Sequence, residues 1–76
     1  MTKTEKTKYI SYMTLKDELK SFTGQGTDLK LDGHLSNASE IAAACVFNEE
    51  SSYMRDYVRD REGRLVSLNF DKVENL

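Results

Sequence analysis

Few residues in this chain have side chains suited to covalent or metal chemistry. His34 is the only histidine and Cys45 the only cysteine. A structural zinc site takes four ligands that are mostly Cys and His, so a site here would need several carboxylates to complete it. A Ser-His or Cys-His catalytic pair would have to use His34, and no serine lies in a nucleophile-elbow pattern. We therefore predict no catalytic residues, no metal site and no cofactor, and a protein that is not an enzyme.

Two further features that could carry chemistry have a structural interpretation. Cys45 has no partner for an internal disulfide and precedes Val46 and Phe47 in an apolar run, which is typical of a small buried side chain. Gly24 and Gly26 lack the Lys-Ser/Thr that follows the glycines of a phosphate-binding loop. We expect Gly24 to end a helix in the left-handed conformation.

The most distinctive cluster of side chains combines aromatic residues with arginines. It consists of Tyr53, Arg55, Tyr57 and Arg59, which occupy every second position of this stretch. Tyr and Arg are enriched at the energetic centres of protein interfaces. These four residues are our candidate partner-binding site, with the alternative that the tyrosines only cover the core.

The stretch around this cluster predicts a β-hairpin. Asp60-Arg61-Glu62-Gly63 suits a type I turn followed by a left-handed residue at Gly63. After it, Val66, Leu68 and Phe70 alternate with polar residues, which predicts a strand with one buried face. Residues 49–61 fit a helix by capping and i, i+4 pairs, but two like-charged i, i+4 pairs disfavour it, so we prefer a strand.

The remaining elements follow from caps and turn residues. Residues 1–8 are rich in Lys and Thr and predict a flexible tail, and residues 9–12 fit a short strand or an extended lead-in. A short helix is expected over about 15–22, and a short strand at 29–31 that runs into the turn pair Asp32-Gly33. A second helix opens at Ser36 or Asn37, has Ile41, Cys45 and Val46 on its inner stripe, and ends near Asn48.

Length and charge narrow the class of protein. A chain of 76 residues forms one domain, here residues 9–76, and 38% hydrophobic residues suffice for a small core. No apolar run is long enough for a membrane span, and no signal-peptide pattern opens the chain, so we expect a cytoplasmic protein without membrane contact. The net charge of −2 argues against general affinity for nucleic acid.

Two resemblances add to this interpretation. With a helix at 49–61, residues 36–70 resemble a winged helix-turn-helix, which implies a DNA-binding regulator with that helix as its recognition helix. Val46 departs from the pattern because the turn usually carries Gly there, and the spacing around Tyr53 is off by about one residue. Separately, residues 52–57 and 70–73 resemble parts of short uncharacterised proteins of bacterial phages and mobile elements.

We therefore predict a small α+β domain in the order helix, strand, helix and C-terminal β-hairpin packed on the helices. Its expected function is binding a protein partner, and the phage resemblance implies an inhibitor or modulator of a host system, such as an anti-defence protein. A winged-helix regulator is the alternative, and a subunit that self-associates through a sheet edge is the third hypothesis.

Overall fold

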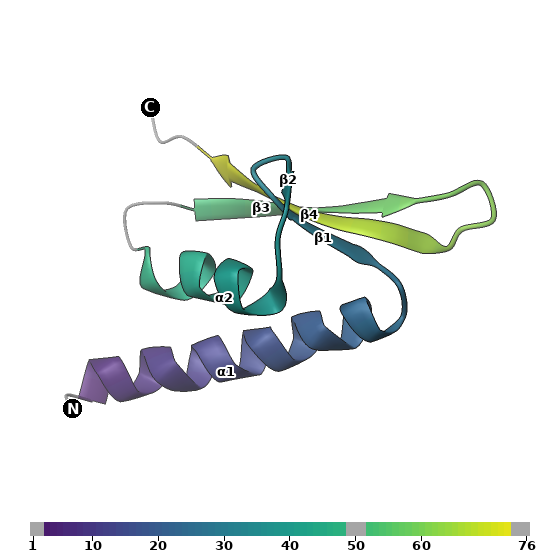
Figure 1. Cartoon of the computed structure of the whole chain (residues 1–76). Coiled ribbons are helices and arrows are strands. Elements are labelled where there is room, and N and C mark those ends of the chain that lie inside the picture. Colours follow the sequence, from purple (N-terminus) through teal and green to yellow (C-terminus); the bar gives the residue numbers. More distant parts are fainter. Residues whose placement is uncertain (1–2, 49–51, 74–76) are drawn as a thin grey trace.

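The protein folds into one sheet covered on one face by two helices. The computed structural model describes residues 3–48 and 52–73, in the order α1 (Lys3–Gly24), β1 (Asp28–Leu31), β2 (His34–Leu35), α2 (Ala38–Phe47), β3 (Ser52–Arg59) and β4 (Leu65–Val73). Figure 1 shows both helices on the same side of the sheet. The predicted α+β domain is confirmed, with the additional short strand β2.

The sheet is mixed, in the order β2-β1-β4-β3. The predicted hairpin is its long antiparallel pair, β3 with β4, and β1 joins β4 in parallel on the other side. Asp32 and Gly33 form the predicted tight turn between β1 and β2, both with positive φ. This order places β3 at one edge of the sheet and β2 at the other.

The core lies between the helices and the inner strands. It consists of Leu19 of α1, Ala38 and Ile41 of α2, Leu29 of β1, and Leu68 and Phe70 of β4. Asn37 is the predicted N-cap of α2, since its side-chain oxygen accepts a hydrogen bond from the Glu40 amide at 2.9 Å. The buried residues of α2 include Ile41, whose exposed fraction is zero, so the predicted inner stripe is confirmed at this position.

The prediction for the N-terminal region was wrong. Residues 3–8, expected as a flexible tail, and residues 9–12, expected as a strand or lead-in, belong to one helix that continues to Gly24; Met1 and Thr2 lie outside the described residues. The Tyr12 ring packs against that of Phe47 on α2, with centroids 5.6 Å apart. This contact between distant segments stabilises the turn of helix before the predicted start at about residue 15, because helix stability comes mainly from tertiary packing.

The end of α1 also differs from the prediction. Gly26, with φ of +84°, takes the left-handed position expected of Gly24. The Thr27 amide donates to the Phe22 carbonyl at 3.1 Å and the Gly26 amide donates to the Thr23 carbonyl at 3.0 Å. These two bonds define a Schellman motif. Its left-handed residue is Gly26, two positions later than expected.

The hairpin turn has the predicted form. Gly63 has φ of +84°, and its amide donates to the Asp60 carbonyl at 3.0 Å. A register shift between Val58 and Arg59 then leaves Val66 as the extra residue on β4. Val66 is therefore 41% exposed, and the prediction that it joins Leu68 and Phe70 on the buried face was wrong.

Candidate functional site

The four predicted partner-binding residues all lie on β3, the edge strand. Residues 52–59 are a strand and not a recognition helix, so the winged-helix alternative was wrong. β3 pairs with β4 on one side only, and Arg55 and Tyr57 lie opposite the core residues Phe70 and Leu68. Because directly opposite residues share a face, the candidate residues lie on the face that carries the helices.

The backbone of β3 presents hydrogen-bonding groups along its free edge. The carbonyl of Phe70 accepts from Asp32 at 2.8 Å, so Phe70 directs its backbone groups away from β3. Arg55, its register partner, is then in a non-hydrogen-bonded pair and directs its own N–H and C=O to the free edge. By alternation the same holds for Tyr53, Tyr57 and Arg59. Each predicted site residue therefore presents its main chain to the outside of the sheet.

The side chain of Arg55 fastens β3 to α1. Its Nη1 donates to Glu18 Oε1 at 2.9 Å and to the Tyr57 hydroxyl at 3.4 Å, and its guanidinium lies 5.2 Å from the centre of the Phe70 ring. The hydrogen bond to Glu18 is the main cause that raises the pKa of Arg55 above its ordinary value. The principal role of Arg55 in the isolated chain is therefore to hold the edge strand against the helix.

The side chains of the other three candidates differ in their accessibility to a partner. Tyr53 is partly buried against the core. Tyr57 is 46% exposed, and Arg59 is exposed, with Nη1 donating to the Gly63 carbonyl at 3.1 Å. The structure thus brings Arg55 and Tyr57 into contact, and places Tyr53 and Arg59 toward opposite ends of the strand. Tyr57 and Arg59 are the accessible members of the cluster.

Two accessible apolar residues of β3 were not among the predicted site residues. Met54 is 62% exposed and Val58 is 36% exposed. They alternate with the four candidates and so lie on the face of the sheet opposite the helices. Leu35 and Val73 share this face by register and are also exposed. In the sequence, Met54 and Val58 alternate with the four candidate residues. This alternation was the signal that could have placed them on the other face of the strand.

A groove lies beside Arg55, between the two helices and β3. Its volume is about 450 Å³, and residues from three elements line it, among them Ile10, Glu18, Cys45 and Arg55. Cys45, predicted to be a small buried side chain, is only partly buried there. Burial raises the pKa of the Cys45 thiol, and the nearby positive charge of Arg55 opposes this only in part. A thiol with a raised pKa is a poor nucleophile at neutral pH, so Cys45 contributes an apolar side chain to the lining of the groove.

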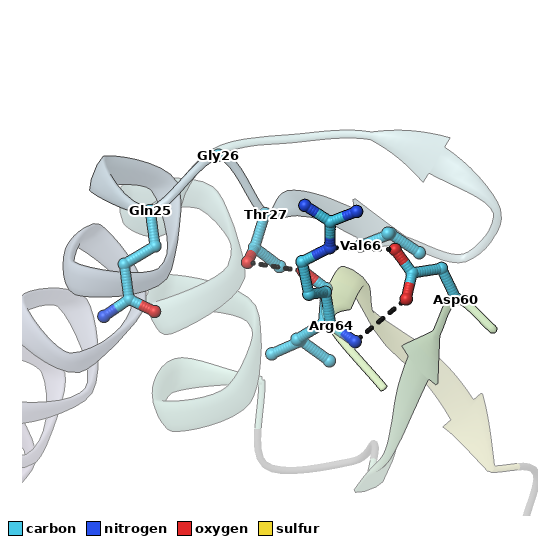
Figure 2. A pocket seen from close by; sticks show the side chains of 7 residues that line it. Gln25, Gly26, Thr27, Asp60, Arg64 and Val66 are labelled. Carbon is cyan, nitrogen blue, oxygen red and sulfur yellow. Dashed lines mark hydrogen bonds and ion pairs between the residues drawn. The ribbon is translucent and has the colours of Figure 1, made fainter. Parts of the chain in front are cut away.

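A second hollow, of about 370 Å³, lies between the turn after α1 and the hairpin turn (Figure 2). The Thr27 hydroxyl, which is buried, donates to the Leu65 carbonyl at 3.2 Å. Arg64 forms ion pairs with Asp60 and Glu62, and the Asp60 carboxylate also accepts from the Arg64 amide at 2.9 Å. The Thr27–Leu65 hydrogen bond therefore joins the segment after α1 to the hairpin, whereas the ion pairs of Arg64 lie within the hairpin turn itself.

The residues with potential for metal or nucleophilic chemistry are spread over separate elements. His34 is on β2, at the sheet edge opposite β3, and Cys45 is on α2. Within residues 3–48 and 52–73 there is no group of three or more His, Cys, Asp or Glu side chains that could hold a metal ion. Neither helix of this part of the chain is long and apolar enough to cross a membrane.

No protein-family model matches the chain, and neither the curated proteins nor the solved structures include a significant match.

Proposed function

We propose that this protein is a small non-enzymatic binding module that recognises a protein partner by adding a strand of that partner to β3. The observation that carries the proposal is the free edge of β3, which is eight residues long and contains no proline. Main-chain hydrogen bonds along such an edge supply affinity, and side chains on alternating faces supply specificity. Here Tyr57 and Arg59 would contact the partner on one face, and Met54 and Val58 on the other.

The arrangement of the helices supports this use of the edge. Both helices lie on one face of the sheet (Figure 1), and neither forms a strand beside β3. Among the described residues, β3 has a paired strand on one side only, so its other edge is available to an incoming strand. The Arg55–Glu18 ion pair holds β3 in place before binding, which reduces the conformational entropy lost on association.

The resemblance to phage and mobile-element proteins suggests a setting for this function. The segments that carry it, residues 52–57 and 70–73, fall on β3 and β4 and so include most of the proposed docking strand. We propose on this basis an inhibitor or modulator of a host protein in the bacterial cytoplasm.

Site-specific photo-crosslinking tests the proposal. A photoreactive phenylalanine analogue replaces Tyr57 in one variant and Tyr9 in a control variant, since Tyr9 has a comparable exposed fraction (53% against 46%) but lies on α1. Irradiation in the source cells should yield a heterologous adduct from position 57 and none from position 9. Co-expression of the unlabelled wild-type chain should reduce that adduct by competition.

The result that contradicts the proposal is equally specific. Equal adducts from both positions, or adducts from position 9 alone, would place the binding surface on the helices. No heterologous adduct from either position would contradict the function itself.

A further inference from the structure

The side chains of β3 are arranged so that the strand can pair with itself. We propose that, in the free protein, the edge of β3 is occupied by β3 of a second copy in antiparallel pairing, and that the two four-stranded sheets form one continuous mixed sheet of eight strands. The inference uses the same edge as the proposed function. It concerns the purified chain alone, so it can fail while binding of a heterologous partner stands.

The backbone limits the registers in which this pairing can occur. A twofold axis perpendicular to the sheet keeps the helices of both copies on one side and makes the two strands antiparallel. Directly opposite residues must then face the same side of the sheet. The residues that direct N–H and C=O to the free edge, Tyr53, Arg55, Tyr57 and Arg59, must also lie opposite one another.

Of the registers that meet these conditions, the one centred on Asp56 places compatible side chains together along the strand. Arg55 lies opposite Tyr57 of the second copy, and Tyr53 lies opposite Arg59, so arginines meet aromatic rings in all four symmetry-related pairs. On the other face, Met54 lies opposite Val58, both of them exposed in the monomer. This register pairs residues 53–59 of β3, all but Ser52.

Neighbouring registers are less favourable. Centring on Arg55 sets Arg55 against its own copy and Met54 against Asp56, and centring on Tyr57 sets Arg55 against Arg59 and Asp56 against Val58. Like charges directly opposite each other destabilise a strand pair, and a charge opposite an apolar side chain gains nothing. Side-chain complementarity therefore selects the register centred on Asp56.

This register has one unfavourable contact, which provides a test. The two Asp56 carboxylates face each other across the axis, on the face away from the helices. Within the described residues the Asp56 carboxylate forms no hydrogen bond or ion pair. Asp56→Asn should therefore tighten the dimer, by about two- to five-fold in Kd, with little effect on the folded monomer. Asp71→Asn makes the same change on β4, on the same face and off the axis, and should leave Kd unchanged.

The opposite change is expected on the helix-bearing face. Tyr57→Lys places a lysine opposite Arg55 at two symmetry-related positions and should weaken the dimer more than about ten-fold. The control is Tyr9→Lys, the same substitution at a comparably exposed tyrosine on α1, which should have no effect on Kd. Circular dichroism melts of each variant show that a change in association does not reflect unfolding.

Sedimentation velocity of the purified chain, from about 1 μM to about 0.5 mM, measures the equilibrium. We expect a reversible monomer–dimer system, since an eight-residue strand pair buries less than the ~800 Å² per partner of a standard interface. A monomer throughout this range for both wild type and Asp56→Asn overturns the proposal. A dimer that Tyr57→Lys does not weaken, or that Asp56→Asn does not tighten, overturns the register and the use of β3.

Discussion

Replacing Ile41 by alanine tests whether α2 and the sheet share the core described above. The Ile41 side chain is fully buried among Leu19, Leu29, Leu68 and Phe70, on the first turns of α2. The substitution removes about three methyl or methylene equivalents at ~0.8 kcal/mol each and leaves a cavity that the neighbours fill only in part. The expected loss is about 2–4 kcal/mol of unfolding free energy. A domain of this length has about 4–11 kcal/mol in total, so the variant loses a large share of its stability.

The chain contains a matched control for this experiment. Ile10 is its only other isoleucine and is 57% exposed on α1, so Ile10→Ala should cost less than about 1 kcal/mol. Urea unfolding of wild type and both variants, followed by far-UV circular dichroism, gives the three free energies. A loss below 1 kcal/mol for Ile41→Ala, or equal losses for the two variants, would refute the packing described here.

Four further predictions follow from local features of the fold. Gly63→Val should lower the unfolding free energy by about 1 kcal/mol or more in the same urea assay, because the turn needs positive φ, whereas Gly24→Ala, at a helical position without positive φ and with open space around it, should be neutral or stabilising. A double-mutant cycle of Glu18→Gln and Arg55→Gln, read by urea unfolding, should give a coupling of about 0.2–1 kcal/mol that decreases with salt, and zero coupling would contradict the ion pair. Burial raises the folded-state pKa of Cys45 above its ordinary value of 9.0, so the stability that this thiol contributes is complete below about pH 9 and is lost as pH rises through the folded-state pKa. Cys45→Ala should therefore show a smaller fall in unfolding free energy over that range. Identical slopes of unfolding free energy against pH for wild type and variant would disprove the linkage. Fluorescence anisotropy of a labelled mixed-sequence duplex from ~50 to 200 mM salt should show binding no tighter than about micromolar, and tighter, salt-sensitive binding would require a DNA-binding function.

Features set by neighbouring residues could be predicted from the sequence. The hairpin turn is one example, because Gly63 must adopt positive φ whatever the strands contact. The cap at Asn37 is another, since it needs only the amide of Glu40, three residues away. The aromatic and arginine cluster on β3 was also identified correctly as a group on one face, because strand alternation depends only on local backbone geometry.

Features that depend on distant contacts were missed. Tyr12 of α1 contacts Phe47, which is far away in sequence, and local composition around residues 9–12 gave no sign of this contact. The exposure of Val66 depends on how β4 is paired with β3, because a single extra residue there alters which side chains face the core.

The candidate site shows the same division between local and tertiary information. The types and alternation of Tyr53, Arg55, Tyr57 and Arg59 are properties of the sequence itself. Only the tertiary structure decided that Arg55 is engaged by Glu18 and that Tyr57 remains accessible. The order of the strands also leaves β3 at an edge, and no local pattern could have shown this, because an edge is defined by the absence of a neighbouring strand and not by the strand's own residues.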